Sequence, residues 1–232
     1  MATKTEDKVA APVAKSALIF ELDDVALEAR AIRYDILQGI LKEQKIDFPA
    51  PCFSRYCLEA FPSTYLPSLL QTLAYTAASA EQVNKRLLSE TTSRLMQKDT
   101  TIRANLIPWL DAAAARQFSI VGLSILPDAD AIAEHLDFAR WGTRILVPAP
   151  SDKPFPHPDL WLRAAKAAGR NPKNTLAIVS SEDSAKGALA AGMNVIAIPD
   201  SFTDFQDFSG VNCLCESLSD LTPAALFDEL SL

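Results

Sequence analysis

Apolar runs of strand length alternate with segments of helical period through the second half of this sequence. The expected strands are Phe118–Leu123, Thr143–Val147, Thr175–Val179, Asn194–Ile198 and Val211–Cys215, with helices expected over 104–116, 128–138, 158–169, 182–191 and 222–230. Repeated strand–helix units of this length need right-handed crossovers and a mostly parallel sheet with helices on its faces. The sequence therefore predicts a doubly wound, Rossmann-like α/β fold.

A further buried strand is expected near the start of the chain, and it ends in acids. The apolar run Ala17–Phe20 is followed by Glu21, Asp23 and Asp24 within four positions. In open α/β sheets, ligands bind outside the carboxyl ends of the strands, so these carboxylates are expected at the edge where chemistry is done. A polar strand end with no chemistry is the alternative, and the sequence leaves it open.

The segment between this strand and the βα units is helical in pattern. Residues 27–44 carry apolar side chains at helical spacing, and residues 51–98 continue the pattern with expected breaks at Phe61–Pro62, Leu66–Pro67 and Ala78–Ser79. We therefore predict an inserted α-helical domain over 28–103. The α/β core then comprises 16–27 and 104–232, after a disordered tail over 1–15.

Composition and charge narrow the class of partner. The chain has 232 residues, 49% of them hydrophobic, which is enough to bury a large core. A net charge of -7 without a basic run argues against nucleic acid or an anionic membrane surface as the main partner. No apolar stretch approaches the roughly 20 residues of a membrane-spanning helix, and residues 1–15 lack the apolar block of a signal peptide. A cytoplasmic protein that binds small molecules or proteins is expected.

The four cysteines allow two interpretations. Cys52, Cys57, Cys213 and Cys215 could supply a four-thiolate zinc site, but neither pair has the two-residue spacing that such sites favour. Reduced structural thiols are the expected state.

Two strand ends resemble motifs of the haloacid dehalogenase superfamily. Ile19-Phe20-Glu21-Leu22-Asp23-Asp24-Val25 is similar to its first motif, hydrophobic-Phe-Asp-x-Asp-Gly-Val/Thr. The resemblance puts Glu21 at the position of the aspartate nucleophile and Asp24 at that of the glycine. The stretch that ends at Ser124 is similar to the second motif, which implies a phosphate-binding hydroxyl there.

The other two motifs follow later strands. Lys153 lies in Asp-Lys-Pro-Phe-Pro before an expected helix, which resembles the superfamily's Gly-Lys-Pro-x-Pro and implies an ammonium that holds the phosphoryl group. Counting back from Ala190-Ala-Gly-Met-Asn-Val-Ile, which resembles the superfamily's Ala-Ala-Gly-Met-x-Val-Ile, the metal-binding acid maps to Ser180. Glu182 and Asp183 lie two and three residues further on, where first-turn helix acids are expected.

The resemblance implies hydrolysis or transfer of a phosphoryl group with magnesium, in an α/β core with a helical cap. It assigns catalysis to Glu21 and Asp23, substrate binding to Ser124 and Lys153, and a magnesium site to Glu21 and Asp23, with Ser180 replacing the expected acid. A glutamate in place of aspartate moves the attacking oxygen by roughly 1.5 Å, and a misplacement of about 1 Å can cost on the order of a hundredfold in rate.

Two hypotheses follow from these departures. The first is a catalytically impaired relative, or pseudoenzyme, of the phosphatase/β-phosphoglucomutase-like branch, which keeps a phosphate- or anion-binding site for a small phosphorylated molecule or serves a protein partner. The second is an active magnesium-dependent phosphatase or phosphotransferase of small phosphate esters that uses Glu21 and Asp23. Its metal site would be rebuilt from Asp24, Glu182 or Asp183.

Overall fold

A six-stranded parallel sheet forms the centre of the protein, in a computed structural model that describes residues 16–59, 61–149, 151–153 and 155–232. The predicted tail over 1–15 lies outside the described residues. The strands are β1 (Ala17–Glu21), β2 (Ser119–Leu123), β3 (Arg144–Leu146), β4 (Thr175–Val179), β5 (Asn194–Ala197) and β6 (Cys213–Leu214), in the order β3-β2-β1-β4-β5-β6. The predicted doubly wound α/β fold is confirmed.

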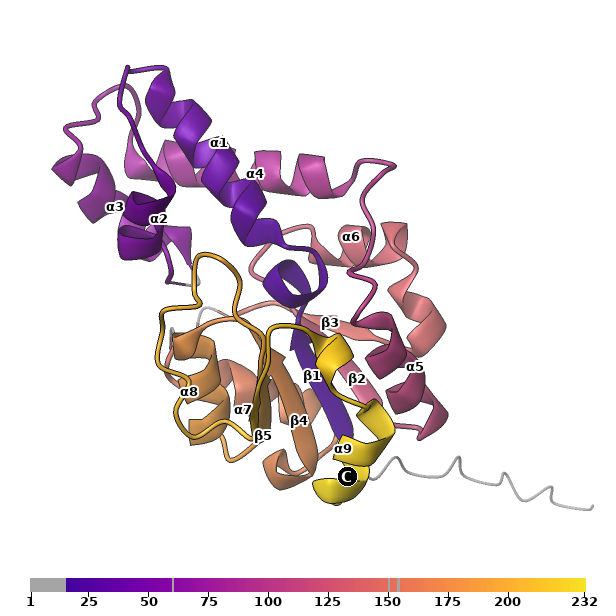
Figure 1. The fold of residues 1–232 in the computed structure, drawn as a ribbon. Helices are drawn as coiled ribbons and strands as arrows, with labels where there is room; N and C mark the ends of the chain where they lie inside the picture. The colour runs from indigo at the N-terminus through magenta and orange to yellow at the C-terminus, as the bar shows by residue number, and fades with distance from the viewer. Residues whose placement is uncertain (1–15, 60, 150, 154) are drawn as a thin grey trace, which may run out of the picture.

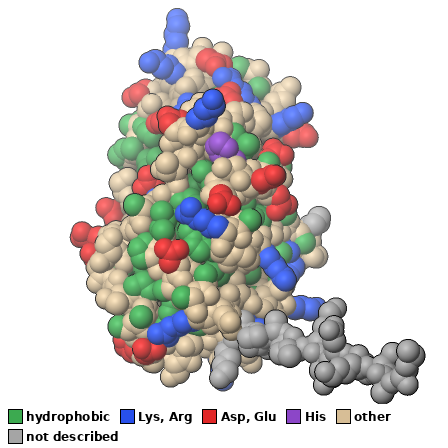
Figure 2. Space-filling view, turned by 90° about the vertical axis from the view of Figure 1, so that its right-hand side faces the viewer, with side chains coloured by type: hydrophobic (Ala, Val, Ile, Leu, Met, Phe, Trp, Pro, Cys, Tyr) green, Lys and Arg blue, Asp and Glu red, His purple; other side chains and the backbone are tan. Residues whose placement is uncertain are grey.

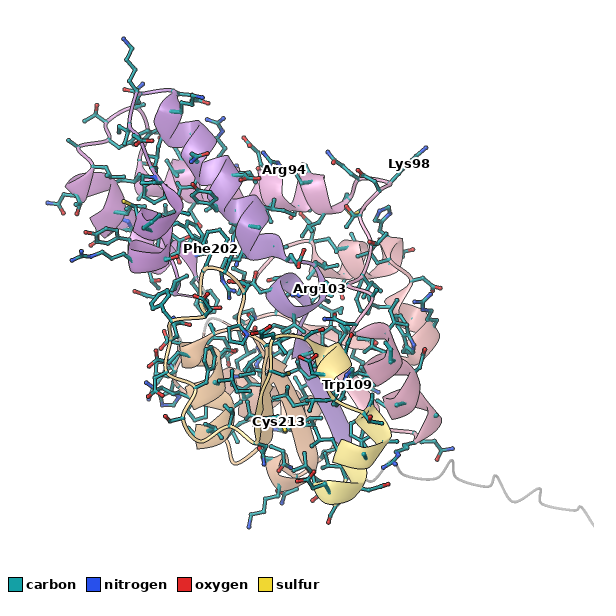
Figure 3. The ribbon with its side chains drawn as sticks, viewed as in Figure 1. Arg94, Lys98, Arg103, Trp109, Phe202 and Cys213 are labelled. Atoms are coloured by element: carbon teal, nitrogen blue, oxygen red, sulfur yellow. The ribbon has the colours of Figure 1, made fainter. Side chains whose placement is uncertain are left out.

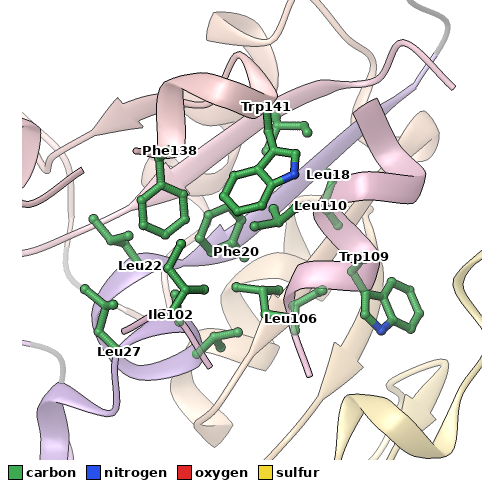
Figure 4. Packing of buried hydrophobic residues seen from close by; sticks show 14 of the residues in the cluster. Leu18, Phe20, Leu22, Leu27, Ile102, Leu106, Trp109, Leu110, Phe138 and Trp141 are labelled. Atoms are coloured by element: carbon green, nitrogen blue, oxygen red, sulfur yellow. The ribbon is translucent and has the colours of Figure 1, made fainter. Parts of the chain in front are cut away.

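The two faces of the sheet are buried under different helices. Successive strand residues point to opposite faces, so Leu18 and Phe20 belong to one hydrophobic cluster while Ala17 and Ile19 belong to another. The first face is covered by α5 (Ile107–Ala115), α6 (Ala129–His135) and α9 (Pro223–Glu229), and the second by α7 (Asp159–Ala167) and α8 (Glu182–Ala190). Figure 4 shows the first face, where Phe20 lies near Phe138 with ring centroids 5.9 Å apart.

Four helices lie together above the carboxyl edge of the sheet (Figure 1). They are α1 (Ala29–Lys42), α2 (Ala50–Tyr56), α3 (Pro62–Thr72) and α4 (Ala80–Leu95). Their buried side chains form a third hydrophobic cluster, which we call the cap cluster, with members such as Leu37, Phe53 and Leu87. The domain boundaries at residues 28 and 103 stay a prediction.

One predicted helix break in this region is wrong. Pro67 lies inside α3 and does not end it. A proline there removes one backbone hydrogen bond, but the helix also buries Leu66, Leu69 and Leu70 in the cap cluster, and this packing holds the segment helical. The break before α4 is as predicted, since Ser79 caps the helix and exchanges hydrogen bonds with Gln82.

The loop between β5 and β6, residues 198–212, connects the sheet to the helical region. Its Phe202 side chain belongs to the cap cluster and lies with its ring centroid 5.1 Å from that of Phe53 and 5.4 Å from that of Tyr34. Figure 3 shows Phe202 at the junction between the loop and these helices. The loop therefore anchors the helices over the carboxyl edge of the sheet.

The surface seen in Figure 2, on the side of α5 and α6, intermixes hydrophobic, acidic and basic side chains. Within the part of the chain that the structure describes, no helix combines the length and the apolar character needed to cross a membrane.

Candidate active site

The strand order reverses between β1 and β4, which places a topological switch point where these neighbouring strands end. Ligands of doubly wound sheets bind in the crevice at such a point. Glu21 is the last residue of β1, and its Oε2 atom accepts hydrogen bonds from Ser180 just after β4, at 2.8 Å from the backbone N and 2.6 Å from Oγ. The structure thus brings together Glu21 and Ser180, two of the positions at which the sequence departs from the superfamily motifs.

Asp23 lies in a buried π-helical turn, Leu22–Ala26, that follows β1 directly. Its carboxylate accepts a 2.6 Å hydrogen bond from Ser124 Oγ and a 2.8 Å bond from the backbone N of Ile125. Ser124 follows β2, the other neighbour of β1, so the predicted pair Asp23 and Ser124 converges at the same edge. The single proton of the Ser124 hydroxyl is committed to Asp23 in this arrangement.

Burial and the charge of Asp24 raise the pKa of Asp23 from 3.8 to about 6. The folded state therefore binds this proton more tightly than the unfolded state. As the pH rises from about 4 to above 6, ionisation of Asp23 lowers the free energy of unfolding by on the order of 3 kcal/mol in total.

Asp23→Asn is thus expected to raise the free energy of unfolding near pH 8 by roughly 2–3 kcal/mol and to change it little near pH 4. An asparagine can keep both hydrogen bonds if its oxygen accepts from Ile125 N and its amide donates to Ser124 Oγ. Urea unfolding at the two pH values measures the difference. Equal destabilisation at both values would contradict the pKa assignment.

Asp24 binds two arginines from α1. Arg33 Nη2 donates to both of its carboxylate oxygens, at 2.9 and 2.8 Å, and Arg30 Nη2 lies 3.1 Å from Oδ2. Burial acts to raise the pKa of Asp24, but the charges of Arg30 and Arg33 outweigh it and the net pKa is lowered. Asp24 is therefore ionised at neutral pH.

Arg30 connects three elements of the fold. Besides Asp24, its guanidinium contacts Ser180 Oγ at 3.1 Å and pairs with Asp200 in the β5–β6 loop. Ser180 Oγ in turn donates to Glu21, so the guanidinium lies one hydroxyl group away from that carboxylate. Burial raises the pKa of Glu21, and the charge of Asp24 adds to the effect.

A small cavity of about 30 Å³ opens beside these carboxylates. Its lining residues are Glu21, Asp23, Asp24, Leu123, Ser124, Ile125, Phe155 and Leu160. This volume holds one or two water molecules. The predicted phosphate-binding Lys153 is not among the lining residues; its exposed ammonium lies 3.4 Å from His157 Nε2.

The carboxylate oxygens of this cluster do not offer the set of ligands needed by the magnesium ion that the superfamily resemblance implies. Mg²⁺ requires a near-octahedral set of oxygens. Here Glu21 Oε2 accepts two hydrogen bonds from Ser180, Asp23 accepts from Ser124 and Ile125, and the Asp24 carboxylate is paired with arginine. Among the described residues, no group of three or more His, Cys, Asp or Glu side chains is placed to hold a metal ion.

Two of the acids proposed to rebuild the metal site, Glu182 and Asp183, lie at the start of α8, as the sequence predicts. The Glu182 side chain pairs with Lys186 in the next turn and accepts a 3.2 Å hydrogen bond from the backbone N of Asp207. Asp183 follows it in the first helical turn. Neither residue lines the cavity beside Glu21.

The sequence-based prediction missed Arg30, Arg33 and Asp200. A signal for the arginines was present, because Arg30, Arg33, Leu37 and Ile40 follow one another at spacings of three and four residues along one helix face. Charged residues that continue an apolar stripe are candidates for burial with partners. Asp200 lies in an irregular loop, and no pattern in the sequence places it beside Arg30.

Comparisons with known proteins identify a relative by sequence and others by fold. The chain is 27% identical over 235 residues to a Bacillus subtilis protein named "Putative phosphatase YhcW", covering 93% of this chain and 97% of that protein. No family model matches the sequence.

Solved structures of low identity share the fold. CbbY from Rhodobacter sphaeroides, solved with phosphate, superposes with a TM-score of 0.78 at 14% identity, covering 92% of this chain and 99% of that one. A β-phosphoglucomutase from Clostridium difficile gives 0.76 at 16% identity, covering 94% and 97%. These structures show that the fold is shared with CbbY and a β-phosphoglucomutase, and the similar Bacillus protein carries the name of a phosphatase, as the predicted resemblance implies.

Proposed function

We propose that this chain is a phosphatase-like protein of the haloacid dehalogenase type whose turnover is impaired or lost. The observation that carries the proposal is the hydrogen bonding of Glu21. Its Oε2 atom accepts one hydrogen bond from the backbone N of Ser180 and one from the Oγ of the same residue. A carboxylate nucleophile must be ionised and free to approach phosphorus. Burial favours the protonated form of Glu21, and the extra methylene places its oxygens differently from those of aspartate.

The ligand class proposed for the site is a small phosphorylated molecule. Relatives in fold support it, since CbbY was solved with phosphate and a CbbY variant with xylulose-1,5-bisphosphate. Ser124 and Lys153 are the proposed anion-binding residues. Because the cavity is small and Lys153 lies outside its lining, binding would require Lys153 to move toward Ser124.

One observation favours the second hypothesis, an active magnesium-dependent phosphatase or phosphotransferase. Asp23, at the general acid/base position, has a pKa of about 6, close to the value that proton transfer near neutral pH requires. A protein partner in place of a substrate remains a prediction from the sequence.

Hydrolysis of small phosphate esters in the presence of magnesium separates the two hypotheses. The parent chain is expected to show no turnover above background, whereas Glu21→Asp with Ser180→Asp and Arg30→Ala, which also removes the guanidinium that contacts Ser180, is expected to gain at least about a hundredfold, as misplacement by one methylene is reversed. Robust turnover by the parent chain that Glu21→Gln abolishes would instead establish the active enzyme. Glu90→Asp, an exposed acid-to-acid change on α4, serves as the control variant.

A further inference from the structure

Two buried arginines place permanent positive charge among the carboxylates at the end of β1. Arg30 is 4% exposed and Arg33 is 5% exposed, although both lie on a helix with ample solvent-facing positions. Burying a guanidinium is costly unless it is paired and hydrogen-bonded. Their burial beside Asp24 and Asp200 indicates that these two acids are neutralised from within the chain.

Arg30 lies one hydroxyl group away from Glu21, the candidate nucleophile. Its Nη2 atom lies between Asp24 Oδ2 and Ser180 Oγ, at 3.1 Å from each. Ser180 stands where the superfamily resemblance expects a metal-binding acid, and its hydroxyl donates to Glu21 at 2.6 Å. The guanidinium thus occupies the position from which a cation would act on the carboxylates at the switch point.

We infer that Arg30 is a built-in cation that takes the place of a divalent metal ion beside Ser180 and Glu21. The inference deepens the proposed function and shares its site. Guanidinium is planar, permanently charged and rich in donors, so it offsets acid repulsion, but it has no vacant coordination position with which to polarise a phosphoryl oxygen.

The charges of the contacts fit this assignment. Arg30 and Arg33 are matched by Asp24 and Asp200, the two acids that contact Arg30 directly. Glu21 and Asp23 receive hydroxyl and backbone donors instead. A divalent ion placed beside Ser180 would therefore meet the Arg30 guanidinium at short range and be repelled by it.

Manganese binding, followed through the electron paramagnetic resonance of free Mn²⁺, tests the inference on the intact chain. The parent is expected to show no saturable site at millimolar Mn²⁺, and its thermal midpoint should be the same in magnesium as in EDTA. Arg30→Ala with Ser180→Asp removes the guanidinium and supplies the missing acid. This variant is expected to bind Mn²⁺ at least tenfold more tightly than the parent.

The matched control is Arg55→Ala with Ser180→Asp, because Arg55 is an exposed arginine of α2 whose guanidinium lies 5.5 Å from the ring centroid of Tyr56. This control variant should bind Mn²⁺ as weakly as the parent does. Equal binding by the two Ser180→Asp variants would overturn the role of Arg30. So would saturable Mn²⁺ binding by the parent that Glu21→Gln abolishes. If the alanine variant does not fold, Arg30→Gln with Ser180→Asp replaces it with the same expectations.

Failure of this inference and failure of the proposed function give different results. A parent chain that hydrolyses phosphate esters in excess EDTA would refute impaired turnover and leave the built-in cation in place. A parent chain that binds Mn²⁺ at Glu21 without turnover would refute the built-in cation and leave impaired turnover in place.

Discussion

Asp24→Asn is expected to lower the free energy of unfolding by about 3–5 kcal/mol. The substitution keeps the shape of the side chain and removes the negative charge that Arg30 and Arg33 share. Arg33 is then left with no carboxylate partner among the described contacts, while its side chain stays buried. Removing one partner of a buried ion pair is costly because the other charge remains desolvated.

Urea unfolding at neutral pH measures this loss, with Asp228→Asn as the control. Asp228 pairs with Arg116 at 2.8 Å but is 74% exposed, so its removal should cost no more than about 1 kcal/mol. A double-mutant cycle adds a sharper criterion, since Asp24→Asn should cost clearly less in an Arg33→Met background than in the parent. A loss at Asp24 no larger than that at Asp228 would show that the buried cluster contributes little to stability.

Phe202→Ala is expected to lower the free energy of unfolding by about 3 kcal/mol. Phe202 is the residue of the β5–β6 loop that enters the cap cluster, where it contacts Phe53 and Tyr34. Truncation leaves a cavity between these rings and removes aromatic contacts that join the loop to α1 and α2.

Phe205→Ala, in the same loop, provides the comparison. Phe205 is 65% exposed, so its truncation should change stability by less than about 0.5 kcal/mol. Equal effects at the two positions, measured by denaturant unfolding, would show that Phe202 does not anchor the loop to the helices.

Periodicity in the sequence was sufficient to predict the sheet and most helices. Thr175–Val179 is found as predicted because a fully buried central strand is a continuous apolar run bounded by polar residues. The edge strand is less accurate: Val211–Cys215 was predicted, but only Cys213–Leu214 pairs with β5. An edge strand pairs with one neighbouring strand alone, and the local sequence does not indicate how far along the strand this pairing extends.

The strand-end residues of the site were also predicted, because parallel strands bring their carboxyl ends to one edge. Glu21, Asp23, Ser124 and Ser180 meet there. The buried ion pairs beside them were not predicted, since Arg30 and Arg33 come from a helix of the inserted segment and Asp200 comes from a loop whose partners are set by tertiary packing. Arg30 contacts Asp200 across 170 positions of the chain, a distance at which no local pattern operates.

The central claim is that a guanidinium stands where a metal ion would act on Glu21. A crystal structure of the parent chain soaked in magnesium and a fluoride mimic of the phosphoryl group tests it most directly. The account predicts the Arg30 guanidinium between Asp24 and Ser180, and no metal at Glu21. An octahedral magnesium ion beside a fluoride-modified Glu21, with Arg30 displaced from Ser180, would contradict it.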